Sequence, residues 1–268
     1  IYGPKVFADF ACNFIDRKSG TGQPFFVYYP MVLVHEPFVP TPDSPEWNDP
    51  ERRYEKDTAY YADMMAYTDK IIGQLEATLK RNNEWENTLF IFTSDNGTHP
   101  TVYSSTTYGV VKGGKGQSDL TGNLVPMVVT WPEKMKGKQV LDAVLSFNDF
   151  LPTFCEAANI PSEKYTTDGH SFLPLLKGGK EQIQEEIFLH YSPRWGRFEH
   201  DRWVMNQTYK LYQDGRFYNM MKDTHEKSPI QQLTETEQKL KEHFQQIIEE
   251  KENEVPFAMN DEEYKLLK

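Results

Sequence analysis

Apolar residues recur at intervals of three and four in several parts of the chain, and this spacing predicts amphipathic helices. The clearest run covers about residues 55–81, where an apolar or small side chain returns to the same face on each turn. A shorter run of the same kind covers residues 6–17. Ser146 can cap a helix through residue 158, and a last helix is predicted at about 234–252.

Short continuous apolar runs between turn-forming residues predict buried strands. These runs are FFVYYP at 25–30, TLFIFT at 88–93 and VPMVVTWP at 125–132. Because they alternate with the predicted helices, we expect an α/β fold with a mostly parallel sheet sandwiched by helices. In such sheets the functional residues gather in the loops at the carboxyl ends of the strands.

The pattern changes near residue 180. Short aromatic-rich runs at 185–191, 201–213 and 216–220 are separated by turn formers, which indicates a small antiparallel sheet. With the helix at 234–252, these runs predict a small α+β subdomain at 181–268. It follows an α/β body that occupies residues 1–180.

Composition narrows the classes of function. The 268 residues carry a formal net charge of -11, which argues against a general surface for nucleic acid or an anionic membrane. No stretch approaches the roughly 18 apolar residues of a transmembrane helix. Cys12 and Cys155 lie in apolar surroundings and are interpreted as buried thiols. The first residues read like the middle of a domain, without a leader.

The most informative stretch is TLFIFTSDNGTHP, in which a buried strand ends on Asp95, Asn96 and Gly97. Both polar side chains offer oxygen atoms, and neither a cysteine nor a histidine cluster lies nearby. Oxygen ligands of this kind suit a hard cation, Ca²⁺ or Mg²⁺. A turn in which Asp and Asn cap their own backbone explains the same residues. From the residues alone, both interpretations stay open.

A glycine-rich stretch, GVVKGGKGQSDLTGN, contains Lys112 and Lys115. It nearly matches the phosphate loop of nucleotide-binding proteins, but Gly116 stands where that loop needs a Ser or Thr, and a turn-rich run follows. We therefore expect no nucleotide loop. Ammonium groups among glycines still suit a tetrahedral oxyanion, with a surface loop as the alternative. His35 and His99 each follow a predicted strand, a position in which an ordinary surface histidine is common.

Taken together and in order, these segments resemble the type I sulfatases of the alkaline-phosphatase superfamily. The ordered set extends from Tyr2 to about Met220 and is more specific than any single motif. The matching stretches are PFFVYYPMVLVHEPFVP, YYADMMAYTDKIIGQLEATL, NTLFIFTSDNGT, KGGKG, LVPMVVTWP, FNDFLPTFCEAANI, DGHSFLPLL and YKLYQDGRFYNM.

The resemblance assigns roles to particular residues. It implies that Asp95 and Asn96 ligate an active-site calcium or magnesium ion. His35 corresponds to the histidine that contacts the sulfate ester or its leaving oxygen, and Lys115 to the lysine that binds the sulfate. Two further side chains are implied near the substrate, with less certain roles: Lys112 and His99.

The sequence also departs from the family pattern. Leu120 and Leu124 stand where Glu and Arg are common after the glycine–lysine loop. The family's nucleophile is a formylglycine made within a C/S-x-P-x-R motif, and no such motif occurs in residues 1–268. The resemblance therefore implies the C-terminal portion of a sulfatase, with the formylglycine expected upstream and the chain inactive alone. A sheet that lacks strands would expose an edge for self-association.

The expected partner is a sulfated small molecule or a sulfated carbohydrate, and family habit suggests a periplasmic or secreted location. Two other functions remain open from the sequence. The chain can be a catalytically inert anion-binding or interaction module. It can also belong to a phosphomonoester or phosphonate hydrolase of the same superfamily.

Overall fold

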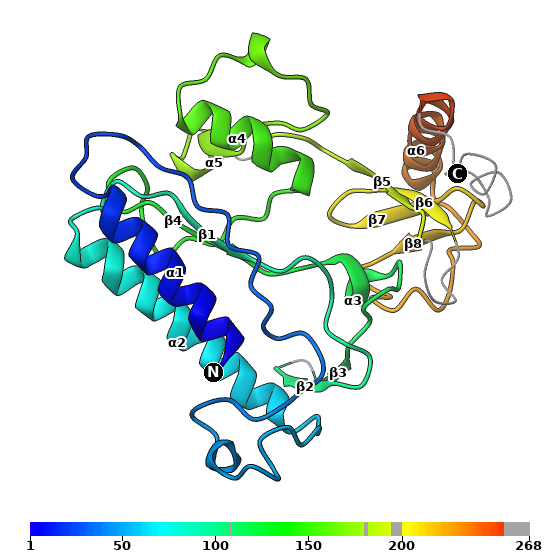
Figure 1. Cartoon of the computed structure of the whole chain (residues 1–268). Helices are drawn as coiled ribbons and strands as arrows, with labels where there is room; N and C mark the ends of the chain where they lie inside the picture. The colour runs from blue at the N-terminus through cyan, green and yellow to red at the C-terminus, as the bar shows by residue number, and fades with distance from the viewer. Residues whose placement is uncertain (108, 180–181, 194–199, 255–268) are drawn as a thin grey trace, which may run out of the picture. The chain divides into compact units, whose positions relative to one another are not determined.

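The computed structural model describes residues 1–107, 109–179, 182–193 and 200–254 (Figure 1). The chain divides into two compact units, which we call unit 1 and unit 2. Unit 1 contains residues 1–113 and 125–137, and unit 2 contains residues 114–124 and 138–268. The predicted division near residue 180 is a different one and stays a prediction.

Two long helices form the core of unit 1. They are α1 (Gly3–Lys18) and α2 (Tyr60–Arg81), which lie side by side (Figure 1). Apolar side chains spaced by three and four meet between them, led by Ala8, Ile15 and Ile71. The helices predicted at 6–17 and 55–81 are therefore confirmed, although α2 begins at Tyr60. A short 3₁₀ helix, η1 (Pro45–Asn48), lies in the proline-rich loop between them.

The strands of unit 1 form two antiparallel pairs. β1 (Phe90–Thr93) pairs with β4 (Met127–Thr130), and β2 (Tyr103–Thr106) pairs with β3 (Gly109–Lys112). All strand pairs in the described residues are antiparallel, so the predicted mostly parallel sheet is not confirmed. A continuous apolar run indicates a buried strand, but it does not indicate whether the neighbouring strand runs parallel or antiparallel.

The strand predicted at 25–30 was wrong, because these residues carry no strand in the structure. Phe26 and Tyr28 are 66% and 79% exposed, whereas a buried strand was expected. A strand requires a hydrogen-bonded neighbour, and none pairs with this segment in the described part of the chain. The β1–β4 sheet is two-stranded, so each strand keeps one edge without a strand partner among the described residues. Self-association through such an edge stays a prediction.

The helical part of unit 2 is organised by Asp149, which is fully buried. Its carboxylate accepts hydrogen bonds from the backbone amides of Ser146 at 2.7 Å and His170 at 2.8 Å. Ser146 begins the helical segment with a capping box, which confirms the predicted cap. The helices of this part are α3 (Leu120–Asn123), η2 (Phe147–Asp149), α4 (Phe150–Ala157), η3 (Ser162–Lys164) and α5 (Leu173–Leu176).

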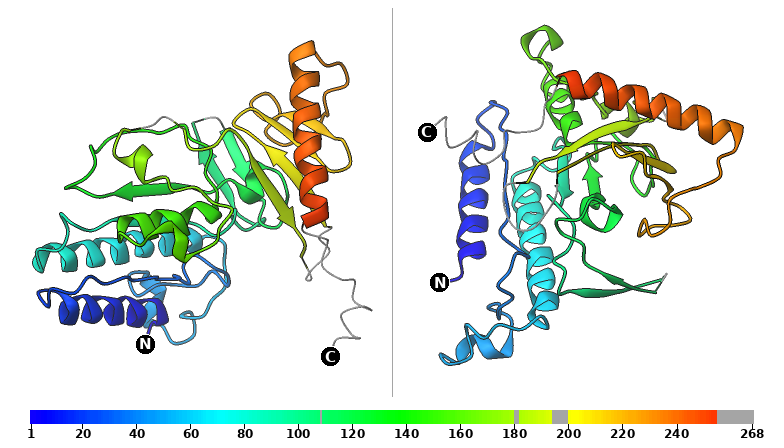
Figure 2. Two further views of the ribbon diagram at one scale, coloured as in Figure 1. Left: turned by 90° about the horizontal axis from the view of Figure 1, so that it is seen from above. Right: turned by 90° about the vertical axis from the view of Figure 1, so that its right-hand side faces the viewer.

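A four-stranded antiparallel sheet with one long helix completes unit 2, as predicted for this region. Its order is β5 (Ile187–Tyr191), β6 (Asp201–Met205), β7 (Tyr209–Tyr212) and β8 (Phe217–Asn219). One face of the sheet carries α6 (Glu235–Glu254) (Figure 2). On this face Val204 and Leu211 pack on Phe244 of the helix. Trp203, Tyr212 and Tyr218 form a separate buried cluster. Buried side chains therefore cover both faces of the sheet.

Both cysteines are buried, as their surroundings predicted. Across the described ranges, no helix has the combination of length and apolar character that a membrane crossing requires.

Candidate functional site

The predicted metal ligands lie in the loop that follows β1. Asp95 is exposed and Asn96 is half-buried. The Ser94 hydroxyl donates to the Asn96 carbonyl at 2.9 Å, and the Thr93 hydroxyl donates to the Pro126 carbonyl at 2.9 Å. The turn is therefore held by one bond of its own and one bond to the segment just before β4, and both predicted ligands stand at the end of a strand.

The donor set of this turn is incomplete for a metal. Carboxylate and amide oxygens fit a hard cation chemically, but Ca²⁺ takes about six to eight oxygen ligands and Mg²⁺ takes six. Among the described residues, no group of three or more His, Cys, Asp or Glu side chains could hold an ion. Asp95 and Asn96 can therefore supply only part of the ligand set of such an ion.

His35 lies in an exposed turn of the proline-rich loop. Its backbone amide donates to the Val32 carbonyl at 2.8 Å, and its Nδ1 lies 2.7 Å from the Glu36 carbonyl. A carbonyl oxygen only accepts, so Nδ1 carries the proton of this bond. In the neutral ring Nε2 is consequently an acceptor, and in the protonated ring it becomes a donor. The ring is oriented by its own loop.

His99 connects the end of the β1 loop to the His35 loop. Its Nδ1 accepts from the Thr101 amide at 3.3 Å, which leaves the proton on Nε2. That nitrogen lies 3.2 Å from a carboxylate oxygen of Glu36, and the ring packs edge-to-face on Phe38 with centroids 5.8 Å apart. The structure therefore brings His99 next to the loop that carries His35.

Lys112 ends β3 and is exposed, with its ammonium 5.9 Å from the centre of the Tyr103 ring. The next residue, Gly113, lies against the backbone that carries His99. A Cβ on Gly113 would meet the His99 and Thr98 carbonyl oxygens at 2.3 and 2.4 Å, so only glycine fits. Unit 1 thus joins the neighbourhoods of Lys112, His99 and His35 through backbone and side-chain contacts.

Lys115 belongs to unit 2, whereas the other five predicted residues belong to unit 1. It occupies the second position of a tight turn that is closed by a 2.8 Å hydrogen bond from the Gln117 amide to the Gly114 carbonyl. Gly116 takes the third position with φ +89°, a backbone conformation that favours glycine. Lys115 is half-buried, and no carboxylate of the described part of unit 2 pairs with its amine.

Sequence reasoning missed the side chains that contact this turn. Lys210 is fully buried and lies 2.9 Å from Glu226, and Tyr191 donates to the Gly116 carbonyl at 3.2 Å. Burial lowers the pKa of Lys210, and the neighbouring Glu226 opposes that shift. One signal was present in the sequence. In YKLY, the alternation of side chains along a strand assigns Lys210 to the same sheet face as the aromatic Tyr212.

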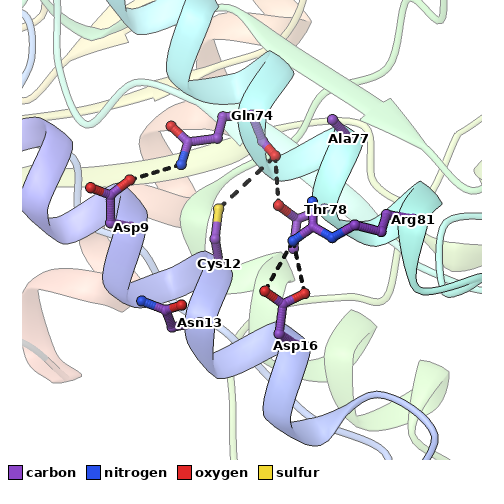
Figure 3. A pocket seen from close by; sticks show the side chains of 8 residues that line it. All are labelled: Asp9, Cys12, Asn13, Asp16, Gln74, Ala77, Thr78 and Arg81. Carbon is purple, nitrogen blue, oxygen red and sulfur yellow. Dashed lines mark hydrogen bonds and ion pairs between the residues drawn. The ribbon is translucent and has the colours of Figure 1, made fainter.

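A polar groove of about 400 Å³ runs between α1 and α2 in unit 1 (Figure 3). Gln74 donates to Asp9 at 2.9 Å, and Arg81 donates to Asp16 at 2.8 Å, so the groove is bridged from helix to helix. None of the six predicted site residues lines it. Its lining comprises Asp9, Cys12, Asn13, Asp16, Gln74, Ala77, Thr78 and Arg81.

Comparisons with known proteins agree on one group of relatives. Human arylsulfatase H is 27% identical over 190 residues, which cover 68% of this chain and 32% of that protein. The uncharacterized sulfatase YdeN of Escherichia coli is 32% identical over 181 residues, which cover 65% of this chain and 30% of that protein. The chain therefore spans about a third of the length of these curated relatives.

Solved structures show the same similarity. The crystal structure of Ps i-CgsB has a TM-score of 0.74 and 25% identity, covering 93% of this chain and 54% of that one. The same protein was also solved in complex with k-i-k-neocarrahexaose. A phosphonate monoester hydrolase from Silicibacter pomeroyi has a TM-score of 0.54 and 17% identity, covering 74% of this chain and 41% of that one, a likeness of fold alone.

Two family models match the chain. The model of the N-sulphoglucosamine sulphohydrolase C-terminal region matches residues 122–254. The sulfatase model matches residues 2–160, which is more than half of the chain. The chain belongs to the sulfatase family.

Proposed function

We propose that this chain supplies the sulfate-holding and leaving-group side of a sulfuric ester hydrolase. In this proposal Lys115 binds the sulfate, with Lys112 and His99 near the substrate, and His35 donates a proton to the leaving oxygen. Asp95 and Asn96 contribute part of the ligand set of a calcium or magnesium ion.

One observation carries the proposal. The sulfatase family match covers residues 2–160 and therefore includes all six residues. The local geometry supports the roles of two of them. The His35 ring is anchored through Nδ1, which leaves Nε2 to face a substrate, and Lys115 stands at the corner of a glycine turn.

The chemistry follows from these two groups. When the S–O bond of a sulfate ester breaks, negative charge develops on the leaving oxygen. A protonated His35 can transfer its Nε2 proton to that oxygen and return to the neutral tautomer described above. The Lys115 ammonium balances the charge of the sulfuryl oxygens throughout. A bound cation would polarise the sulfate further, and the formylglycine nucleophile is expected outside this sequence.

The substrate class and location are parts of the same proposal. We assign a sulfated small molecule or a sulfated carbohydrate as the substrate. The structural neighbour that was solved with k-i-k-neocarrahexaose supports the carbohydrate. A periplasmic or secreted site of action is proposed from the habits of the family. The 268-residue chain by itself is proposed to bind an anion without turning over an ester.

Sulfate titration of the ¹⁵N-labelled chain tests the anion site directly. Sodium sulfate at constant ionic strength should shift the amide signals of Lys115 and Gly116. Lys115→Met should abolish these shifts because the ammonium is lost. Lys177→Met is the matched control, since it removes an exposed lysine of the same unit and should leave the shifts unchanged. Equal sulfate shifts in wild type and Lys115→Met would contradict the role of Lys115.

Hydrolysis assays separate the remaining alternatives. The isolated chain should release no product from an aryl sulfate or an aryl phosphate, because its sequence contains no C/S-x-P-x-R motif. Turnover of either ester by the isolated chain would overturn the proposal. Calorimetry with calcium should give only weak binding, since two neighbouring oxygen donors leave most of the coordination sphere to water. Tight calcium binding together with tight sulfate binding would favour a self-sufficient anion-binding module.

A further inference from the structure

We propose that the sheet of unit 2 is a positioning device for the Lys115 turn, in which Tyr191, Lys210 and Tyr212, backed by Glu226, hold residues 114–119 in the conformation that presents the lysine. The inference rests on the proposed function only for the role of Lys115, which is to bind sulfate. The positioning itself stands on contacts within unit 2.

The turn depends on outside support because its internal bonding is slight. It is closed by the hydrogen bond from the Gln117 amide to the Gly114 carbonyl, and one such bond contributes little to stability on its own. A four-residue turn with that bond alone would exchange among conformations, and the amine of Lys115 would move with it.

Three contacts from distant parts of the chain supply the support. The Tyr191 hydroxyl donates to the Gly116 carbonyl at 3.2 Å. The Lys210 ammonium donates to the Ser118 carbonyl, and the Tyr212 and Ser118 hydroxyls lie 3.1 Å apart. The three sheet residues are 75 to 94 positions away from their partners in sequence. They hold the turn and the residues just after it.

These sheet residues belong to one face of the sheet. Trp203 pairs with Tyr212, and Met205 with Lys210, in the register of β6 and β7. Side chains alternate between faces along a strand, so Lys210 and Tyr212 point to the same side, while Leu211 points to the side covered by α6. One face of the sheet therefore packs against α6, and the other face contacts the Lys115 segment.

Lys210 is the unusual member of this group. It is fully buried, its partner Glu226 is 5% exposed, and its ammonium lies 4.6 and 4.5 Å from the ring centres of Trp203 and Tyr212. A buried ion pair is often no more stable than a well-packed apolar pair of the same volume. Stability alone therefore does not account for it. What the ammonium adds is a donor to the Ser118 carbonyl, and the rings stabilise its charge.

The other end of the segment is fixed by close packing. Asp119 caps α3 by accepting from the Thr121 amide at 2.9 Å. A Cβ on Gly122 would lie 2.1 Å from the Gln117 carbonyl oxygen, and one on Gly114 would lie 1.8 Å from the Thr121 hydroxyl. The turn is thus closed between α3 and the sheet, and Lys115 projects from a restrained backbone.

Amide exchange in the 268-residue chain tests the positioning without any ligand. Tyr191→Phe removes only the hydroxyl that bonds the Gly116 carbonyl. It should accelerate hydrogen exchange at the Gln117 amide, which closes the turn, by about fivefold, the equivalent of one lost hydrogen bond. The double variant Lys210→Met/Glu226→Gln should accelerate it further.

Tyr209→Phe is the matched control. It also removes one phenol hydroxyl from the same sheet, but that hydroxyl donates to Glu237 of α6 at 3.1 Å. Tyr209→Phe should leave exchange at Gln117 unchanged. If both Phe variants accelerate exchange at Gln117 equally, or if neither does, the positioning role is wrong. A merely structural role of Tyr191 would alter unfolding without this local difference.

Sulfate titration then separates the positioning from the proposed function. If both are right, Tyr191→Phe should weaken sulfate binding, seen as the shift of the Lys115 amide, whereas Tyr209→Phe should not. Faster exchange at Gln117 with unchanged sulfate affinity would keep the positioning and overturn the anion-binding role of Lys115. Unchanged hydrogen exchange at the Gln117 amide in Tyr191→Phe would overturn the positioning role, whether or not sulfate binding changes.

Discussion

The turn that carries Lys115 and the turn that carries Asp95 and Asn96 are built in different ways. In the Asp95 turn, Ser94 bonds a carbonyl two residues away, and one bond from Thr93 reaches the neighbouring strand region. In the Lys115 turn, a local bond from the Asn123 side-chain amide group to the Ser118 carbonyl is joined by three bonds from residues 75 to 94 positions away. Both turns present a polar side chain, but only the second is held by a buried network.

The difference bears on what each turn can do before a ligand arrives. A turn held by distant contacts has its conformation only when the surrounding unit is folded, and it then keeps that conformation. A turn with few supporting bonds retains local freedom, and a bound ion can supply the missing restraint. We therefore expect the lysine to be preorganised for an anion and the Asp95–Asn96 pair to become ordered on binding.

The largest expected effect is that of Lys210→Met. The substitution leaves Glu226 as a buried carboxylate without its cation, so the free energy of unfolding should fall by about 3–5 kcal/mol. Urea unfolding of the chain measures this loss. Asp95→Ala should change the unfolding free energy by less than about 0.5 kcal/mol, because that side chain is exposed.

The double variant Lys210→Met/Glu226→Gln controls for the stranded charge. Glutamine keeps an acceptor for the Tyr212 hydroxyl, which donates to Glu226 in the native protein. The double variant should therefore recover at least half of the stability lost by Lys210→Met. A loss below about 1 kcal/mol in the single variant would show that Lys210 does not carry a buried charge.

The two regions can next be compared through one glycine of each. A Cβ on Gly122 would lie 2.1 Å from a carbonyl in unit 2, and a Cβ on Gly113 would lie 2.3 Å from one in unit 1. Each Gly→Ala variant should lose about 1–3 kcal/mol of unfolding free energy through overpacking. Gly137→Ala is the control, with no atom within 4 Å of the new Cβ, and should be nearly neutral. Neutral behaviour at Gly113 would mean that the His99 backbone can move aside.

A smaller effect is expected from pH. Burial, and then the neighbouring Arg202, lower the pKa of His190 below its ordinary 6.5, and Arg202 donates to its Nδ1 at 3.0 Å. The unfolded chain therefore binds more protons than the folded chain between the lowered pKa and 6.5. Stability should be fully present above pH 6.5 and decline as the pH falls toward the folded-state pKa.

His190→Asn isolates this contribution, because the amide preserves an acceptor near the position of Nδ1 but does not titrate. Urea midpoints measured from neutral to mildly acidic pH should decline less steeply in this variant than in wild type. Identical slopes in the two proteins would remove His190 as a source of pH dependence in the sheet that supports Lys115.

The smallest effect is expected at Glu36. Its carboxylate lies 3.2 Å from His99 but is 52% exposed, and ion pairs of this kind contribute about 0–1 kcal/mol. Glu36→Gln retains an acceptor for the His99 Nε2 proton, so unfolding at low and high salt should differ little from wild type. A loss as large as that of Lys210→Met would show that unit 1 also depends on a buried charge network.

Helices were predicted from the sequence because their signal is local. In α2, residues from Met64 to Leu79 return to one face every three or four positions, and that face is buried in the structure. Strand pairing is not local. The FFVYYP run has the composition of a buried strand, yet a strand also needs a neighbour that its own residues do not specify.

The candidate site divides in the same way. The sequence suggested the loops of His35, Asp95 and Lys115 because each follows an apolar run or a glycine cluster. Two contacts were not predicted because they join residues far apart in the chain. These are the Glu36–His99 contact and the hydrogen bond from Lys210 to the Ser118 carbonyl. From sequence alone a lysine in a strand is expected to face solvent. Lys210 is an interior cation only because the surrounding aromatic side chains bury it.

The handedness of the backbone at Gly116 has a consequence for chemical synthesis. With φ at +89°, this residue has the conformation that mirror-image amino acids prefer. A chain assembled by chemical ligation with D-alanine at position 116 should keep the turn. Because D-alanine allows the unfolded chain fewer conformers than glycine does, the free energy of unfolding should rise by about 0.4–1 kcal/mol. L-Alanine there would oppose the turn, so the two enantiomers should shift the melting temperature in opposite directions.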